Sequence, residues 1–260
     1  MGHERIGHLP RNASWRKIVG LLENAAGASE AEVAGVATKT LDLVRERFLA
    51  LHRDSGVQAA FGFLVAIARS AVATSDSRTP PNVPLPSDST PFRLTVALND
   101  WVDAHAQSPE YAELSKRAAA EAIAAWHHQQ SRQEGLFAES PNDISRQVWA
   151  SASTGAGFSE VSRLFLARLT ERYLRYFLER EASAVVKNID ARESFSQNLH
   201  LSIDAVSQHA FETSRIAQSF AAGWFNKHAR LQTPNNALLS NFLRVAFGKI
   251  REELKREALR

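Results

Sequence analysis

The stretch VQAAFGFLVAIARSAVA, residues 57–73, decides the fold of this chain. Its central part, residues 59–68, carries no charge and ends at Arg69. A helix that crosses a membrane needs about 20 apolar residues, and this stretch is shorter. A helix that is apolar on all sides must instead be covered by other elements of the protein. We therefore expect residues 57–73 to form a buried helix at the centre of a helical bundle.

A proline-rich segment, TSDSRTPPNVPLPSDSTP, follows at residues 74–91. Proline donates no backbone hydrogen bond and fixes its own φ angle, so the five prolines from Pro80 to Pro91 prevent a regular element here. The segment is predicted to be an interdomain linker or a long surface loop, because its serine and aspartate residues favour contact with water. It divides the chain into an N-terminal three-helix bundle, residues 1–73, and a larger C-terminal helical bundle, residues 92–260.

Apolar residues recur at three- and four-residue spacing through most of the remaining chain, which is typical of amphipathic helices. Two long helices are expected, at about residues 159–186 and 201–229. Residues 131–158 are expected to be irregular apart from one short helix at 141–150. No stretch alternates between apolar and polar residues as a half-buried strand does. The fold prediction is therefore all-α, with about seven or eight helices in one or two bundles.

The composition excludes several kinds of site. The 260 residues include no cysteine, so disulfides, thiolate nucleophiles and cysteine-bound zinc or iron–sulfur centres are excluded. Residues 1–10 lack the apolar core of a secretory signal, and a reducing, cytoplasmic location is expected. The formal charge is +3, and the basic residues are interleaved with acidic ones. The charge alone therefore gives little support to nucleic-acid binding.

A glycine-rich turn leads into the helix predicted from residue 159. Thr154, Gly155 and Gly157 of this turn can present free backbone N–H groups, and Arg163 follows one turn into the helix. Such N–H groups attract anions, because the helix dipole is positive at its start. The sequence predicts that the turn is exposed and binds an anion or the carboxylate of a partner. The alternative is that the two glycines only let neighbouring helices approach closely.

The helix predicted after this turn carries a charged stripe, in which Arg168, Arg172 and Arg175 lie with Glu171 and Glu179. Pairs such as Glu171–Arg175 have the spacing of helical ion pairs, so the stripe neutralises much of its own charge. A solvated helix face is the simplest interpretation. The alternative is that the three arginines form a face that binds an acidic partner or nucleic acid.

The histidines do not form a complete metal site. His200, Asp204, His209 and Glu212 lie on one predicted helix. At about 100° per residue, His200 and His209 point to opposite sides of that helix and cannot hold one ion together. We therefore expect no metal and no cofactor.

The opening residues 2–19, GHERIGHLPRNASWRKIV, resemble the start of uncharacterised bacterial proteins from mobile or anti-phage defence loci. The resemblance includes no mechanistic motif, so it transfers no site. It implies an accessory subunit encoded beside an ATPase or a nuclease.

The sequence contains no complete catalytic set of residues, and several predicted helices have broad apolar faces. We therefore expect a non-enzymatic scaffold or adaptor subunit of a bacterial cytosolic complex, with protein partners that include a second copy in a homodimer. The resemblance adds anti-phage defence as its setting. The first alternative is an accessory nucleic-acid-binding protein that uses arginines of residues 163–180 and 249–260. The second is a membrane-active effector that inserts residues 57–73, against which the short apolar core and Arg69 argue.

Overall fold

The computed structural model describes residues 39–40, 45–76, 83–107, 109–134, 141–185, 189–190, 193–194, 197, 200–201 and 215–257. Within these ranges every regular element is helical, so the all-α prediction is confirmed. In chain order the elements are α3 (Arg45–Ala50), the short 3-10 helix η1 (Leu51–Arg53), α4 (Ser55–Asp76), α5 (Pro91–His105), α6 (Pro109–Glu134), α7 (Pro141–Ala152), α8 (Gly155–Val185), α10 (Arg215–Trp224), the π-helical turn η2 (Phe225–Ala229) and α11 (Asn236–Glu257).

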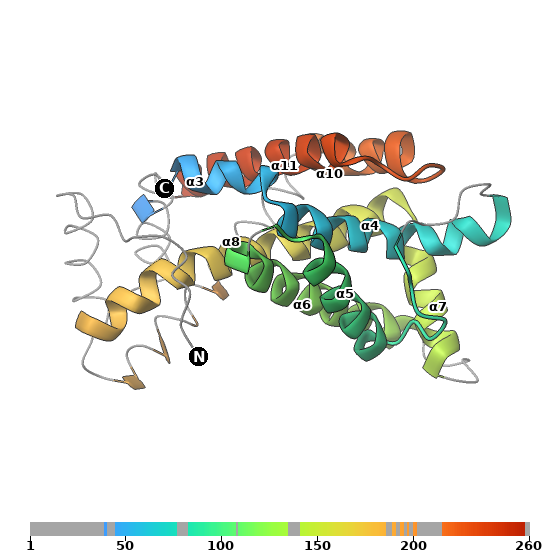
Figure 1. Cartoon of the computed structure of the whole chain (residues 1–260), viewed down its shortest axis with the longest axis horizontal. Coiled ribbons are helices and arrows are strands. Elements are labelled where there is room, and N and C mark those ends of the chain that lie inside the picture. Colours follow the sequence, from blue (N-terminus) through green and yellow to red (C-terminus); the bar gives the residue numbers. More distant parts are fainter. Residues whose placement is uncertain are drawn as a thin grey trace.

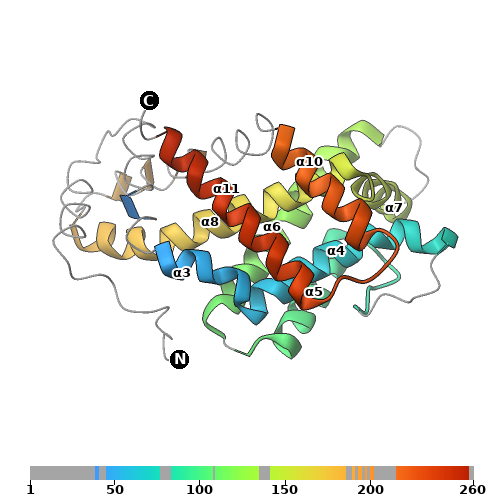
Figure 2. The same cartoon turned by 90° about the horizontal axis from the view of Figure 1, so that it is seen from above.

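Helix α4 lies at the centre of the described fold. It packs against α5, α6, α7, α8 and α11. Figure 1 shows α10 and α11 on one side of it, α5 and α6 on the other, and α7 at one end. Figure 2, the view from above, shows α10 and α11 crossing over α4 and α8. The helices thus surround α4 rather than lying beside it in a row.

The sequence of α4 explains its central place. Asp54 precedes the helix, and its Oδ1 accepts a hydrogen bond from the Val57 N–H at 2.9 Å, which satisfies a free donor of the first turn. Residues 57–69 are then buried, apart from the half-buried Gln58 and Gly62. The buried, central position predicted for this stretch is confirmed. Among the residues that the structure describes, no helix is long and apolar enough to span a membrane.

An aromatic cluster joins α4 to the helices around it. Phe61 of α4 stacks on Phe242 of α11, with ring centroids 4.9 Å apart and planes at 12°. Its centroid also lies 5.8 Å from that of Phe165 in α8. Phe158, near the start of α8, stacks on Phe225 of η2 at 4.4 Å. All these rings are shielded from solvent, so the cluster ties α4, α8, η2 and α11 into one core.

Helices on both sides of the proline-rich segment share this core. The sequence assigns α4 to an N-terminal bundle that ends at residue 73, but α4 packs against α5 to α8 beyond the segment. The reason is that a helix apolar on all sides needs neighbours on all sides. Within the segment Val83 is buried, and the Ser89 carbonyl oxygen accepts a hydrogen bond from Trp149 Nε1 at 3.0 Å. Residues 83–90 therefore lie as a loop against the core.

Several predicted boundaries shift. Helix α8 begins at Gly155, before the predicted start at residue 159, and α6 continues to Glu134. Of the helix predicted at 201–229, the described part consists of residue 201, α10 and η2. Residues 1–38 lie outside the described ranges, so the N-terminal bundle stays a prediction there.

The substitution Phe61→Ala is expected to lower the free energy of unfolding by about 3–5 kcal/mol, because it opens a cavity among buried rings. The matched control is Phe92→Ala on α5, where the side chain is 73% exposed. The control should change stability by less than about 0.5 kcal/mol. Urea unfolding followed by circular dichroism measures both variants. Equal losses in the two would contradict the central position of α4.

Candidate functional site

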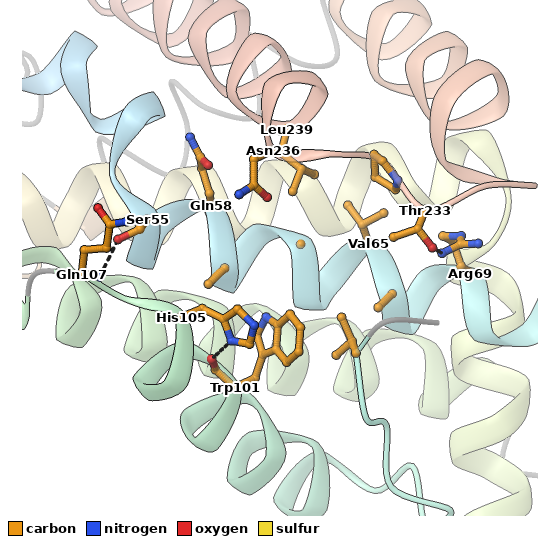
Figure 3. Close-up of a pocket in the computed structure, with 15 residues that line it drawn as sticks. Ser55, Gln58, Val65, Arg69, Trp101, His105, Gln107, Thr233, Asn236 and Leu239 are labelled. Carbon is orange, nitrogen blue, oxygen red and sulfur yellow. Dashed lines mark hydrogen bonds between the residues drawn. The ribbon is translucent and has the colours of Figure 1, made fainter. Parts of the chain in front are cut away.

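A cavity of about 470 Å³ runs along one face of α4 (Figure 3). The α4 side of the cavity includes residues three or four positions apart, which share one face of a helix. These residues are Ser55, Ala59, Gly62, Ala66 and Arg69. The other walls come from Val83, from α5 and Gln107 beyond its end, and from the loop before α11 and the first turn of α11. The volume lies within the roughly 300–1,000 Å³ typical of ligand pockets.

Small residues on α4 explain why this space is not filled by the protein. Ala59, Gly62 and Ala66 stand where a helix in a close-packed interior usually carries larger side chains. A Cβ added at Gly62 would meet only the Cδ1 of Leu239, at 3.3 Å. The cavity is partly open to solvent, and the small residues of α4 give it its depth.

Arg69 lies at one end of the cavity (Figure 3). It is only 3% exposed, although a guanidinium stays charged at neutral pH. Its Nη1 donates a hydrogen bond to Oγ1 of Thr233 at 2.8 Å, while its Nε is buried without a partner. No aspartate or glutamate of the described ranges pairs with it, in contrast to the buried Arg163 of α8, which pairs with Glu160.

The position of Arg69 is costly for the folded protein. Burial lowers the pKa of Arg69, because it disfavours the charged form. Taking a charge out of water costs on the order of several kcal/mol unless an opposite charge and hydrogen bonds compensate for it. Thr233 supplies one neutral acceptor. An anion in the cavity would supply the opposite charge and further acceptors.

Two rings of α5 form one wall of the cavity. The rings of Trp101 and His105 stack with centroids 3.7 Å apart. Nδ1 of His105 donates to the Trp101 carbonyl oxygen at 2.8 Å, so Nε2 of the neutral ring is the acceptor. The Nε1–H of Trp101 is buried without an acceptor. This wall therefore combines apolar ring surface with polar ring atoms.

The end of the cavity opposite Arg69 is polar and uncharged. There Oγ of Ser55 accepts a hydrogen bond from the Gln107 N–H at 2.7 Å. The amides of Gln58 and Asn236 lie between the two ends (Figure 3). No acidic side chain is among the described residues that line the cavity. Its electrostatics are therefore dominated by the guanidinium at one end.

The predicted anion site at residues 154–157 has a packing role. Oγ1 of Thr154 accepts a hydrogen bond from the Gly157 N–H at 3.0 Å and so caps α8. A Cβ on Gly157 would lie 2.1 Å from a backbone oxygen of α7, and one on Gly155 would lie 2.8 Å from the Cβ of Ala222 in α10. The glycines permit close approach of these elements, as the alternative interpretation holds. Anion binding at this turn stays a prediction.

Arg163, the basic residue predicted to support that turn, is held by Glu160. Its Nε and Nη2 donate to the two carboxylate oxygens at 2.9 and 2.7 Å. Arg163 is buried, and its charge is compensated within α8.

The charged stripe of α8 is paired inside the protein. Its ion pairs are Arg168–Glu171 at 3.3 Å, Arg175–Glu171 at 3.4 Å, His200–Glu171 at 2.8 Å and Arg172–Glu121. Glu171 is buried, and the three arginines are half-buried rather than fully solvated. A partner or nucleic acid would have to compete with the two glutamates for Arg168, Arg172 and Arg175. Their role as a binding face stays a prediction.

The predicted histidine helix is described only in part. His200 lies beside Glu171, while Asp204, His209 and Glu212 fall outside the described residues. Among the residues that the structure does describe, no group of three or more His, Asp or Glu could hold a metal ion.

A serine–histidine pair connects α6 and α7. Nε2 of His127 lies 3.0 Å from Oγ of Ser145. Ser145 is fully buried, so a substrate has no access to its hydroxyl, and the hydrogen bond joins the two helices. Burial and, to a smaller extent, the charge of the neighbouring His128 lower the pKa of His127.

None of the cavity residues is predicted as a site from the sequence. In the sequence Arg69 ends an apolar run and argues against membrane insertion, but it is not predicted to bind a ligand. A usable signal was present, because a single charge in an apolar helix lies on the same face as Ala59, Gly62 and Ala66. The sequence does not indicate which elements cover that face.

No protein-family model, no curated protein and no solved structure matches this chain. The resemblance of residues 2–19 to defence-locus proteins therefore stays a prediction. The function proposed below depends on the geometry of the cavity.

The substitution Gly157→Ala is expected to lower the free energy of unfolding by about 1–3 kcal/mol, because the backbone of α7 must move to admit the Cβ. The matched control is Gly223→Ala on α10, where nothing lies within 4 Å. There alanine should stabilise the helix by about 0.5–1 kcal/mol. Thermal unfolding compares the two. A fully stable Gly157→Ala variant would argue against the packing role.

Protonation of His127 is expected to destabilise the fold. Its pKa is lower in the folded than in the unfolded protein, so the unfolded state binds more protons below about pH 6.5 and stability falls as the pH drops through that range. One such proton contributes at most about 1.4 kcal/mol per pH unit. Urea unfolding at pH 7.5 and 5.5 should show a smaller loss for His127→Gln than for the wild type. Identical pH dependence would contradict this account.

Proposed function

We propose that this chain is a helical binding protein whose cavity takes a small organic anion that pairs with Arg69. The observation that supports this function is a guanidinium only 3% exposed that lines a cavity and has no carboxylate partner in the described chain. Charged residues are almost never fully buried in proteins unless they are paired. The cavity beside Arg69 offers the space for a partner that is not part of the chain.

The affinity for an anion is raised because Arg69 is already held in place before the anion binds. Charge-assisted hydrogen bonds between a guanidinium and an oxyanion are about twice as strong as neutral ones. Arg69 is already largely shielded from solvent in the folded protein, and Thr233 holds one of its nitrogens in place. Such preorganisation increases affinity, because the ligand need not order the site.

Binding is favoured over catalysis by the chemistry of the lining. Its polar groups are a guanidinium, side-chain amides, hydroxyls and two nitrogen-containing rings. Among the described lining residues, His105 is the one histidine. Its hydrogen bond goes to a backbone carbonyl rather than to a serine or a carboxylate. These groups orient a ligand and do not form a nucleophile–base pair.

The scaffold or adaptor hypothesis is compatible with a binding cavity, and we propose a ligand-binding adaptor of a bacterial cytosolic complex as the second candidate. Phe92 and Val96 lie one turn apart on α5 and are 73% and 44% exposed. The helix that supplies Trp101 and His105 thus carries an apolar pair that a protein partner or a second copy could cover. Light scattering, which gives the mass in solution, tests the homodimer.

The two alternatives have less support. For a nucleic-acid-binding protein, Arg168 and Arg172 would have to leave the glutamates that now neutralise them. For a membrane-active effector, α4 would have to leave the core, which includes the stacked Phe61. Both alternatives require the loss of contacts that hold the described fold together.

Replacing Arg69 with methionine tests the proposed function. Methionine keeps an apolar stem and removes the unpaired charge, so ligand-free Arg69→Met should be as stable as the wild type or more stable by about 1–2 kcal/mol. The matched control is Arg163→Met, which removes a buried arginine that has its own carboxylate. The free energy of unfolding of this control should fall by about 1–3 kcal/mol. Urea unfolding measures both free energies.

The same two variants are screened by thermal shift against organic carboxylates, sulfonates and phosphate monoesters. A ligand that stabilises the wild type and Arg163→Met, but not Arg69→Met, supports the proposal. At 100 times Kd such a ligand stabilises the folded state by about 2.7 kcal/mol. The proposal fails if no member of the panel gives Arg69-dependent stabilisation, or if Arg69→Met loses as much stability as Arg163→Met.

A further inference from the structure

We infer that the ligand of this cavity is a monocarboxylate with an apolar body of about 10 Å. This inference rests on the proposed function and adds the charge, the head group and the length of the ligand. It follows from three observations: Nη2 of Arg69 is left without a partner in the described chain, Arg69 is the single basic side chain of the described lining, and part of the cavity is apolar.

The guanidinium of Arg69 is hydrogen-bonded on one side. Nη1 donates to Oγ1 of Thr233 at 2.8 Å, whereas Nε and Nη2 have no partner within the described chain. Nε is enclosed by protein atoms, whereas Nη2 is the nitrogen that an oxygen of a carboxylate can reach. Thr233 therefore orients the guanidinium and leaves Nη2 to donate a charge-assisted hydrogen bond to a carboxylate.

The charge of the lining fits one negative charge. Arg69 is the one lysine or arginine among the described lining residues, and its nearest polar partner, Thr233, is neutral. A carboxylate forms a neutral pair with it. A phosphate monoester carries about −1.5 to −2 charges near pH 7 and would leave negative charge in a buried site. Uncompensated charge in such a site is unfavourable, so the carboxylate is preferred.

Between its two ends the cavity has an apolar floor, with the amides of Gln58 and Asn236 at its side. Ala59, Gly62 and Ala66 form its floor on α4, with the rings of α5 on one side and Leu239 of α11 on the other (Figure 3). From Ala59 to Ala66 the helix rises by about 10 Å, at 1.5 Å per residue. Polar groups of Ser55 and its neighbours lie beyond this stretch. An apolar body of this length is therefore covered by the protein, while its far end meets polar groups.

Octanoate is the probe for this ligand class. Its binding is measured by isothermal titration calorimetry beside three relatives: octanamide has the same body without the charge, octyl phosphate has a more highly charged head, and acetate has the head without the body. We expect octanoate to bind at least tenfold more tightly than each of the three. Arg69→Met should reduce octanoate binding at least tenfold.

A variant that fills the middle of the cavity tests whether the protein binds the apolar body of the ligand, separately from its carboxylate. Gly62→Leu adds a side chain where a Cβ meets only Leu239. It should keep its helical circular dichroism spectrum and lose at least tenfold in octanoate affinity. The matched control is Gly223→Leu, at a helical glycine with nothing within 4 Å, which should bind octanoate as the wild type does.

The outcomes separate this inference from the proposed function. If octyl phosphate binds more tightly than octanoate and still depends on Arg69, the carboxylate assignment is wrong and the proposed anion-binding function stands. If acetate binds as well as octanoate, or if Gly62→Leu binds octanoate as the wild type does, the inference of an apolar ligand body is wrong. If octanamide binds as tightly as octanoate, Arg69 does not recognise a charge, and both ideas fail. They also fail together if no organic anion binds the wild type.

Discussion

Helix α4 needs cover on every side, and this requirement determines where the other described helices lie. Its apolar surface faces α5, α6, α7, α8 and α11, and Phe61 stacks at the centre of the aromatic cluster. Because helices from both sides of the proline-rich segment supply this cover, residues 83–90 run along one shared core. The same helix presents Arg69 and the small residues that line the cavity. The centre of the fold and the candidate site therefore depend on one element.

Two features of α4 lower the stability of the fold, and both lie on the helix face that lines the cavity. Small side chains leave a cavity, which loses packing contacts, and at its end Arg69 places a charge that no acidic side chain of the described residues neutralises. Buried arginine is not unusual in this chain, since Arg163 is also buried, but Arg163 has a carboxylate on two of its nitrogens. Real proteins break the rules of packing and pairing mainly at functional sites. The coincidence of both features on one helix face is the reason to assign function there.

The fold class was predictable from the sequence, whereas the site was not. Periodicity shows which residues share a helix face. The buried helix at residues 57–73 was predictable from its apolar composition alone. Periodicity does not show which elements cover that face, and Thr233 lies 164 positions away from Arg69. For the turn at residues 154–157 the sequence left two roles open. Glycines serve both anion binding and close packing, and the distance from a Cβ at Gly157 to the α7 backbone favours packing.

The location of the cavity also bears on what a ligand would do to the protein. Its walls come from α4, from α5 and from the loop that joins η2 to α11, so a bound ligand would touch three segments that are distant in sequence. Phe225 fixes the π-helical turn in the aromatic cluster, and Thr233 follows in the loop beside Arg69. Turns of this type occur frequently at functional sites. A ligand that binds only the assembled cavity adds its binding energy to the contacts among these segments. The described fold therefore gives a small anion a direct physical route to stabilise the arrangement of α5 and α11 around α4.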